Sequence, residues 1–201
     1  MKFPDFSTEA NHRGIVAGID EAGRGPWAGP VVAAIVILDK ACLPHGVHDS
    51  KQLSKPKREM LYDIICAQAL TGVGICSVEE VDRHNVLGAT KLAMQRAYAA
   101  ISVKPDIALV DGNQLPDLPC DMDAIIDGDA LCMSIAAASI IAKVTRDRMM
   151  VALAEEFPGY GWERNAGYGT REHQDGLARL GVTAHHRRSF APIRKLLTQA
   201  A

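Results

Sequence analysis

The sequence predicts an α/β fold in which helices flank a mixed β-sheet and a helical segment forms the C-terminal part. Two observations support this prediction. Two apolar runs come first, and apolar runs then alternate with longer segments of helical spacing. The chain is also 201 residues long, 48% hydrophobic and 23% charged, which suits one globular domain with a sizeable core.

The individual elements follow from these patterns. Apolar runs predict strands at 15–20, 31–38, 73–78, 106–112 and 123–129. Helical spacing predicts helices at 53–70, 81–101, 134–157, 170–180 and 190–199. The Gly- and Pro-rich loop after the first strand allows a hairpin, and Ser54 is a candidate N-cap with Pro56 in the first helical turn. We expect a single domain over 1–201, with a core at about 13–157 and a C-terminal helical part at about 158–201.

Composition narrows the classes of protein. The net charge of −2 gives no general attraction for nucleic acid, so any polyanion site must be local. The five cysteines are odd in number and never form a C-x-x-C pair, which argues against a disulfide framework and a zinc site. The first 20 residues lack an apolar signal segment, and no run is long enough to span a bilayer. We therefore expect a cytoplasmic protein with no membrane partner.

Carboxylates are expected at the ends of three strands. Asp20 and Glu21 follow the first, Asp111 the fourth, and Asp127 or Asp129 the fifth. Strand ends are where sites form in α/β sheets, and clustered buried carboxylates repel one another. A hard divalent cation relieves this repulsion, and Mg²⁺ and Mn²⁺ accept few carboxylates together with water and phosphate. The acids therefore predict Mg²⁺ or Mn²⁺ and a phosphate-containing ligand.

A second interpretation applies to some of these acids. Asp111 and Asp127 each precede a glycine, so for either acid alone a solvated turn residue is the favoured interpretation. No turn or cap explains Asp20 with Glu21. Because successive strand residues point to opposite faces, we expect the chain to leave regular strand geometry at Glu21 so that both acids serve one site.

The loop after the first acids offers ligand contacts. Gly23 and Gly25 let the backbone approach a ligand, and Arg24 adds a charged donor. A plain tight turn is the alternative. Lys51, in DSKQLS, is a candidate phosphate contact or a solvated side chain.

Polar residues also occur on the Ala-rich helix and beyond it. Ser134, Ser139, Lys143 and Arg146 are candidates to face a ligand; the alternative is a buried Ser139 and a solvated Lys143. Residues 143–195 contain ten Lys and Arg against six Asp and Glu, a modest basic footprint. Tyr168, between two glycines, is a candidate for stacking on a base or a sugar.

Taken together, seven segments resemble the ribonuclease HII family. They occur in the expected order between residues 18 and 190, and the first and fifth are long and specific. The segments are GIDEAGRGPWAGPVVAA, DSKQLS, LVDG, the GD of 128–129, SIAAASIIAKVTRDR, GYGT and HHRRSF.

The resemblance implies an RNase H-like fold and a metal-dependent endonuclease. Its expected substrates are the RNA strand of RNA–DNA hybrids and DNA duplexes with single embedded ribonucleotides, cut on the 5′ side. Four metal-site acids are implied, with Asp129 rather than Asp127 in the fourth position: Asp20, Glu21, Asp111 and Asp129. It also implies that Gly23–Gly25 recognise the 2′-OH region and that Tyr168 stacks on the adjacent deoxynucleotide sugar.

Other points stay open at the level of sequence. We expect a monomer, and no clamp-binding motif stands out in RKLLTQAA (194–201), so a sliding-clamp partner is left undecided. Another RNase H-like nuclease acting on branched DNA, a non-catalytic hybrid-binding module and a metabolic α/β protein are the competing classes.

Overall fold

The computed structural model describes residues 4–199. Residues 1–3 and 200–201, which include the end of the predicted C-terminal part and of RKLLTQAA, lie outside the described residues. The strands are β1 (Val16–Ala22), β2 (Val31–Ile37), β3 (Leu70–Cys76), β4 (Ile107–Asp111) and β5 (Asp121–Ile125). The α-helices are α1 (Ser7–Ala10), α2 (Lys55–Gln68), α3 (Val78–Ala100), α4 (Gly128–Leu131), α5 (Met133–Glu156), α6 (Trp162–Asn165), α7 (Arg171–Leu180) and α8 (Ala191–Gln199), with a 3₁₀ turn η1 (Ser50–Gln52).

The strands form one mixed five-stranded sheet in the order β3-β2-β1-β4-β5. β2 runs antiparallel to both β1 and β3, whereas β4 runs parallel to β1 and β5. The predicted pairing of the first two strands and the mixed sheet are therefore confirmed. β1 pairs with β2 as far as Ala22, but its pairing with β4 stops at Ile19. The edge of β1 that faces β4 is thus open beyond Ile19.

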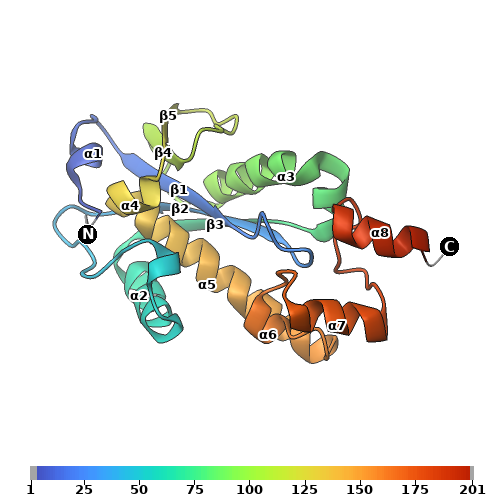
Figure 1. The fold of residues 1–201 in the computed structure, drawn as a ribbon. Coiled ribbons are helices and arrows are strands. Elements are labelled where there is room, and N and C mark those ends of the chain that lie inside the picture. The colour runs from blue at the N-terminus through green and yellow to red at the C-terminus, as the bar shows by residue number, and fades with distance from the viewer. Residues whose placement is uncertain (1–3, 200–201) are drawn as a thin grey trace.

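Helices cover both faces of the sheet (Figure 1). α3 packs on one face, where Ala93 and Ala97 meet Ile19 and Ile35. α5 and α2 cover the other face. Gly18 allows the start of α5 to lie directly on β1, since a Cβ there would be 2.2 Å from the carbonyl carbon of Ser134.

The C-terminal helices α6 and α7 lie at the far end of α5, and α8 lies beside the start of α3 (Figure 1). A separate apolar cluster holds them there, made of Ala28, Met150, Tyr160, Trp162, Leu177 and Ile193. This packing brings the C-terminal part against the loop between β1 and β2: Trp27 N–H donates to Gly167 O at 2.8 Å, and Arg187 N–H donates to Trp27 O at 2.8 Å.

Several element boundaries differ from the sequence prediction. β5 ends at Ile125, because Asp127 adopts a left-handed conformation (φ 55°) and α4 follows at once. α3 begins at Val78 because Ser77 and Glu80 form a capping box, a signal the prediction did not use. Ser54 stands at the N-cap of α2 but makes no capping hydrogen bond. Among the described helices, none is long and apolar enough to cross a bilayer.

Candidate active site

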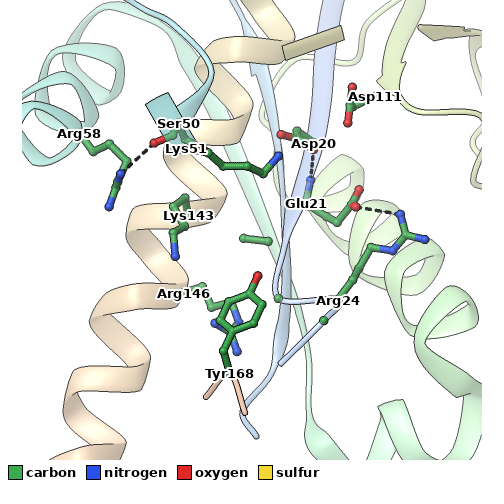
Figure 2. A pocket seen from close by; sticks show the side chains of 13 residues that line it. Asp20, Glu21, Arg24, Ser50, Lys51, Arg58, Asp111, Lys143, Arg146 and Tyr168 are labelled. Carbon is green, nitrogen blue, oxygen red and sulfur yellow. Dashed lines mark hydrogen bonds and ion pairs between the residues drawn. The ribbon is translucent and has the colours of Figure 1, made fainter. Parts of the chain in front are cut away.

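A pocket of about 370 Å³ opens where β1 runs past the end of β4. Six separate stretches of sequence contribute to it, and Figure 2 shows their side chains converging from β1, η1, α2, β4, α5 and the loops. The lining residues are Asp20, Glu21, Ala22, Gly23, Arg24, Gly25, Ser50, Lys51, Arg58, Asp111, Lys143, Arg146 and Tyr168.

Asp20 and Glu21 both line this pocket from within β1. Their partners across the sheet are Ala34 and Ala33, in unbroken register. The expectation that the chain leaves regular strand geometry at Glu21 is therefore wrong. Both side chains reach one pocket because the β4-facing edge of β1 is open beyond Ile19.

The third and fourth acids come from the next segments of chain. Asp111 ends β4, and its Oδ1 accepts the Gly128 N–H at 2.8 Å, which ties β4 to the start of α4. Asp129 lies buried in the first turn of α4, with its Oδ2 at 3.4 Å from Lys51 Nζ. Asp127, in contrast, is exposed. The expectation that the fifth strand itself ends in an acid is thus wrong, because a turn and a short helix carry Asp129.

Burial and mutual repulsion dominate the electrostatics of the acids. The pKa of Asp20 is raised well above its usual value by burial first, then by the charges of Glu21 and Asp111. Burial also raises the pKa of Glu21, against the opposing effect of Arg24, whose guanidinium lies 3.2 Å from Glu21 Oε1. Burial, Asp49 and Asp111 raise the pKa of Asp129. The pocket thus concentrates negative charge that a cation would stabilise.

The donor chemistry of this cluster suits a hard cation. Its carboxylates offer only oxygen ligands, which Mg²⁺ and Mn²⁺ prefer. Between residues 4 and 199, however, no three His, Cys, Asp or Glu side chains converge closely enough to hold a metal ion by themselves. Asp20, Glu21 and Asp111 line an open pocket instead, with Asp129 beside it, so a cation there would complete its ligands from water or substrate.

The glycine loop (Gly23–Gly25), which directly follows β1, forms another wall of the pocket. Gly23 has φ +98°, and a Cβ at this residue would be 2.1 Å from Arg146 Nε. A Cβ on Gly25 would lie 3.3 Å from the ring of Tyr168. Glycine at 25 therefore lets the Tyr168 ring, which is 48% exposed, lie close to the loop at the pocket mouth (Figure 2).

A pair of buried histidines, His173 and His186, lies next to the backbone of Tyr168. His173 Nδ1 lies 3.0 Å from Tyr168 O, and His173 Nε2 lies 3.0 Å from His186 Nε2. Trp162 Nε1–H donates to His173 Nε2 at 3.1 Å. Burial, followed by the proximity of His173, lowers the pKa of His186 to about 4. The pair is therefore neutral at pH 7.

Basic side chains from η1, α2 and α5 also line the pocket. Lys51 extends toward Asp20 in Figure 2, and Lys143 pairs with Asp147 at 2.7 Å. Arg58, which the sequence analysis did not select, donates to Ser50 O at 2.8 Å and so fixes the segment that carries Lys51. Nothing in the local sequence distinguishes Arg58 from the other basic residues of α2.

Three predicted site residues are not among those that line the pocket. Asp129 is one of them; it lies next to the lining, 3.4 Å from Lys51 Nζ. The other two are serines. Ser134 is buried and donates its hydroxyl to Glu9 Oε1 at 2.7 Å. Ser139 is also buried; its hydroxyl donates to Ala136 O at 2.8 Å and accepts the Ser50 N–H at 3.3 Å. Both serine hydroxyls are thus engaged within the protein rather than directed at a ligand.

Arg146 borders the pocket but is only 1% exposed. Its guanidinium donates to the carbonyls of Pro30, Ala166 and Ala28 at 2.9, 2.9 and 3.0 Å. Arg146 therefore shapes the glycine loop with donors that a ligand cannot also use.

The architecture matches solved ribonucleases. Ribonuclease H2 from Pyrococcus horikoshii has a TM-score of 0.79 at 27% identity and covers 92% of this chain and 98% of that chain. The RNase HII of Archaeoglobus fulgidus, solved in complex with PCNA, has a TM-score of 0.70 at 33% identity and covers 86% of this chain and 93% of that chain. Fold and pocket together define a nuclease of the ribonuclease H class.

Sequence comparison narrows this class to one family. The model of the family described as Ribonuclease HII matches residues 17–193. Ribonuclease HII of Paramagnetospirillum magneticum is 58% identical over 194 residues, which cover 94% of this chain and 96% of that protein. The chain belongs to the ribonuclease HII family and is a ribonuclease H enzyme that acts on nucleic acid, as the sequence resemblance predicted.

Proposed function

We propose that this enzyme cleaves the RNA strand of RNA–DNA hybrids and cuts 5′ of single ribonucleotides embedded in duplex DNA. The observation that carries the proposal is one pocket in which repelling carboxylates face a glycine loop and an exposed tyrosine. The acids suit hydrolysis of a phosphodiester, and the loop suits recognition of a sugar. The expected products carry 5′-phosphate and 3′-OH ends.

Asp20, Glu21, Asp111 and Asp129 would hold two divalent cations, Mg²⁺ or Mn²⁺. Such ions, when bound, lower the pKa of a water and stabilise the charge on a phosphate undergoing hydrolysis. The raised pKa of Asp20 supports this assignment, because the cluster repels further negative charge until a cation compensates it. Lys51 lies 3.4 Å from Asp129 and keeps part of that charge balanced.

The protein's own groups would bind and orient the substrate. Backbone N–H groups of Gly23–Gly25 line the pocket and suit the 2′-hydroxyl, the group that distinguishes RNA from DNA. The exposed Tyr168 side chain suits stacking on the sugar of the adjacent deoxynucleotide. Lys51 and Lys143 suit contacts with phosphates on the side opposite the loop. Rate enhancement by such a site comes mainly from positioning and charge stabilisation.

A strand-specific cleavage assay tests this proposal. The substrate is an end-labelled DNA duplex with one ribonucleotide, its all-DNA twin is the control, and the reactions contain Mg²⁺, Mn²⁺ or EDTA. We expect a metal-dependent cut on the 5′ side of the ribonucleotide and none in the twin. Cleavage of a long hybrid alone would remove the junction role of the loop and Tyr168. Cleavage of an all-DNA branched substrate instead would favour a junction nuclease.

A sliding clamp is a partner to test. The relative from Archaeoglobus fulgidus was solved with PCNA, which motivates the question for this chain. Size-exclusion chromatography of the full chain, alone and mixed with the sliding clamp of its own host, measures both the expected monomer and the complex. Separate elution of the two proteins at micromolar concentration would remove the clamp from consideration.

A further inference from the structure

Arg187 lies behind the glycine loop and is fully buried. Its guanidinium donates five hydrogen bonds to four backbone carbonyl oxygens. The distances are 2.6 Å to Gly23 O, 2.9 Å to Arg24 O, 2.8 and 3.0 Å to Gly29 O, and 3.2 Å to Pro30 O. One side chain from near the end of the chain thus fixes both ends of the loop that follows the first two acids.

These bonds determine where the peptide N–H groups of the loop point. The described chain has no cis peptide bonds, and in a trans peptide the C=O and the N–H point in opposite directions. Because the carbonyls of Gly23 and Arg24 point inward to Arg187, the N–H groups of Arg24 and Gly25 point outward. Both residues line the pocket. Within residues 4–199, neither of these two N–H groups donates to a backbone or side-chain acceptor.

The environment of Arg187 is adapted to this arrangement. Burial, followed by the charge of Arg146, lowers the pKa of Arg187 to about 9, so the side chain is still charged at pH 7. A planar guanidinium can donate hydrogen bonds to several carbonyls at fixed angles, whereas the N–H donors of a lysine ammonium all belong to one nitrogen atom. The neighbouring segment is anchored as well, since Asp82 on α3 accepts the N–H groups of Arg188 and Ser189, each at 2.9 Å.

We propose that Arg187 is a positioning residue that presents the N–H groups of Arg24 and Gly25 to the 2′-oxygen of the ribonucleotide. The proposal deepens the function proposed above and rests on it. A deoxyribose lacks that oxygen and leaves both N–H groups without an acceptor, so the orientation of the loop contributes directly to the choice of RNA over DNA.

The test compares Arg187→Lys with Arg188→Lys. Both variants keep the charge, but Arg188 is exposed and uses only its backbone N–H in the contact with Asp82. The rate of single-turnover cleavage of the single-ribonucleotide duplex should fall about 10- to 100-fold in Arg187→Lys. The reason is that the N–H groups of Arg24 and Gly25 would move, and the ribonucleotide would no longer be held in the reactive position. Binding of the all-DNA twin should change less than about twofold, because phosphate contacts dominate it. Arg188→Lys should behave as wild type in both measurements.

The outcomes separate the two proposals. If the wild-type enzyme leaves the ribonucleotide duplex uncut, the proposed function fails. If the wild type cuts it and folded Arg187→Lys cuts it at the same rate, the positioning role alone is overturned. A lower melting temperature with an unchanged single-turnover rate also overturns it, because that result describes a purely structural side chain.

If Arg187→Lys does not fold, a measurement on the wild-type protein tests the proposal instead. In ¹⁵N-labelled enzyme with EDTA, the amide signals of Arg24 and Gly25 should shift when the ribonucleotide duplex is added. The shifts should be smaller with the all-DNA twin at the same saturation. Equal shifts with both duplexes would show that these N–H groups do not read the 2′-oxygen.

Discussion

Replacing Gly23 with alanine combines two effects that can be separated. The first is conformational: φ is +98°, and a left-handed conformation costs a residue with a Cβ about 1–2 kcal/mol. The second is steric, because the new Cβ would lie 2.1 Å from Arg146 Nε and 2.7 Å from Pro30 O. These two atoms form a hydrogen bond of 2.9 Å, which cannot persist around the added carbon. Loss of such a charge-assisted bond costs roughly 1.5–3 kcal/mol.

The two effects predict that Gly23→Ala lowers the free energy of unfolding by about 2.5–5 kcal/mol. Gly112→Ala is the matched control: its φ is +85°, and a Cβ there meets no atom within 4 Å, so only the conformational cost of about 1–2 kcal/mol applies. Urea unfolding in EDTA, followed by circular dichroism and tryptophan fluorescence, measures both variants without a contribution from bound cations. Equal destabilisation of the two variants would refute the steric argument.

Three further predictions concern the acids, the tyrosine and the histidine pair. Asp20→Asn and Asp111→Asn should each lower cleavage at least about 100-fold while the circular dichroism spectrum is retained, since the charges that hold a cation are lost but the shape is not; wild-type turnover would remove that acid from the site. Tyr168→Ala should slow cutting at a single ribonucleotide roughly tenfold, more than cutting of a long hybrid, because stacking at the junction is lost; equal losses would contradict the junction role. The pKa of His186 is about 4 in the folded protein, against 6.5 in the unfolded chain. Between these two pH values the unfolded state binds more protons than the folded state. The free energy of unfolding should therefore decrease by roughly 3 kcal/mol as the pH falls from 6.5 toward 4. Urea titrations at pH 7, 5.5 and 4.5 measure this loss, and His186→Gln should show a flatter profile unless His173 carries the effect.

The sequence predicted most of the elements because their patterns are local. The apolar run at 31–38 and the helical spacing at 134–157 correspond to β2 and α5. The pocket depends on something non-local, namely how far β4 extends beside β1. Strand alternation suggested that Asp20 and Glu21 could share a site only if the chain left strand geometry at Glu21. Instead β1 stays regular as far as Ala22, and its edge toward β4 is open beyond Ile19.

The same limit applies to individual side chains. Ser134 and Ser139 have the residue type expected of ligand contacts, but their partners Glu9 and Ser50 lie about 125 and 89 residues away in the sequence. No local pattern could reveal those bonds. Arg187 was visible within the family segment HHRRSF, yet its role depends on carbonyls at the opposite end of the chain.

The dependence of the glycine loop on Arg187 has a consequence for biosynthesis. The two residues joined by the bond from Arg187 to Gly23 O are 164 positions apart, so the loop emerges from the ribosome long before the side chain that fixes it. Domains generally fold as units, and contacts of high sequence separation form slowly. A prematurely terminated chain that lacks Arg187 would therefore carry the acids of β1 without the side chain that holds the loop beside them, and the proposed selectivity for the sugar would depend on a segment synthesised 164 residues later.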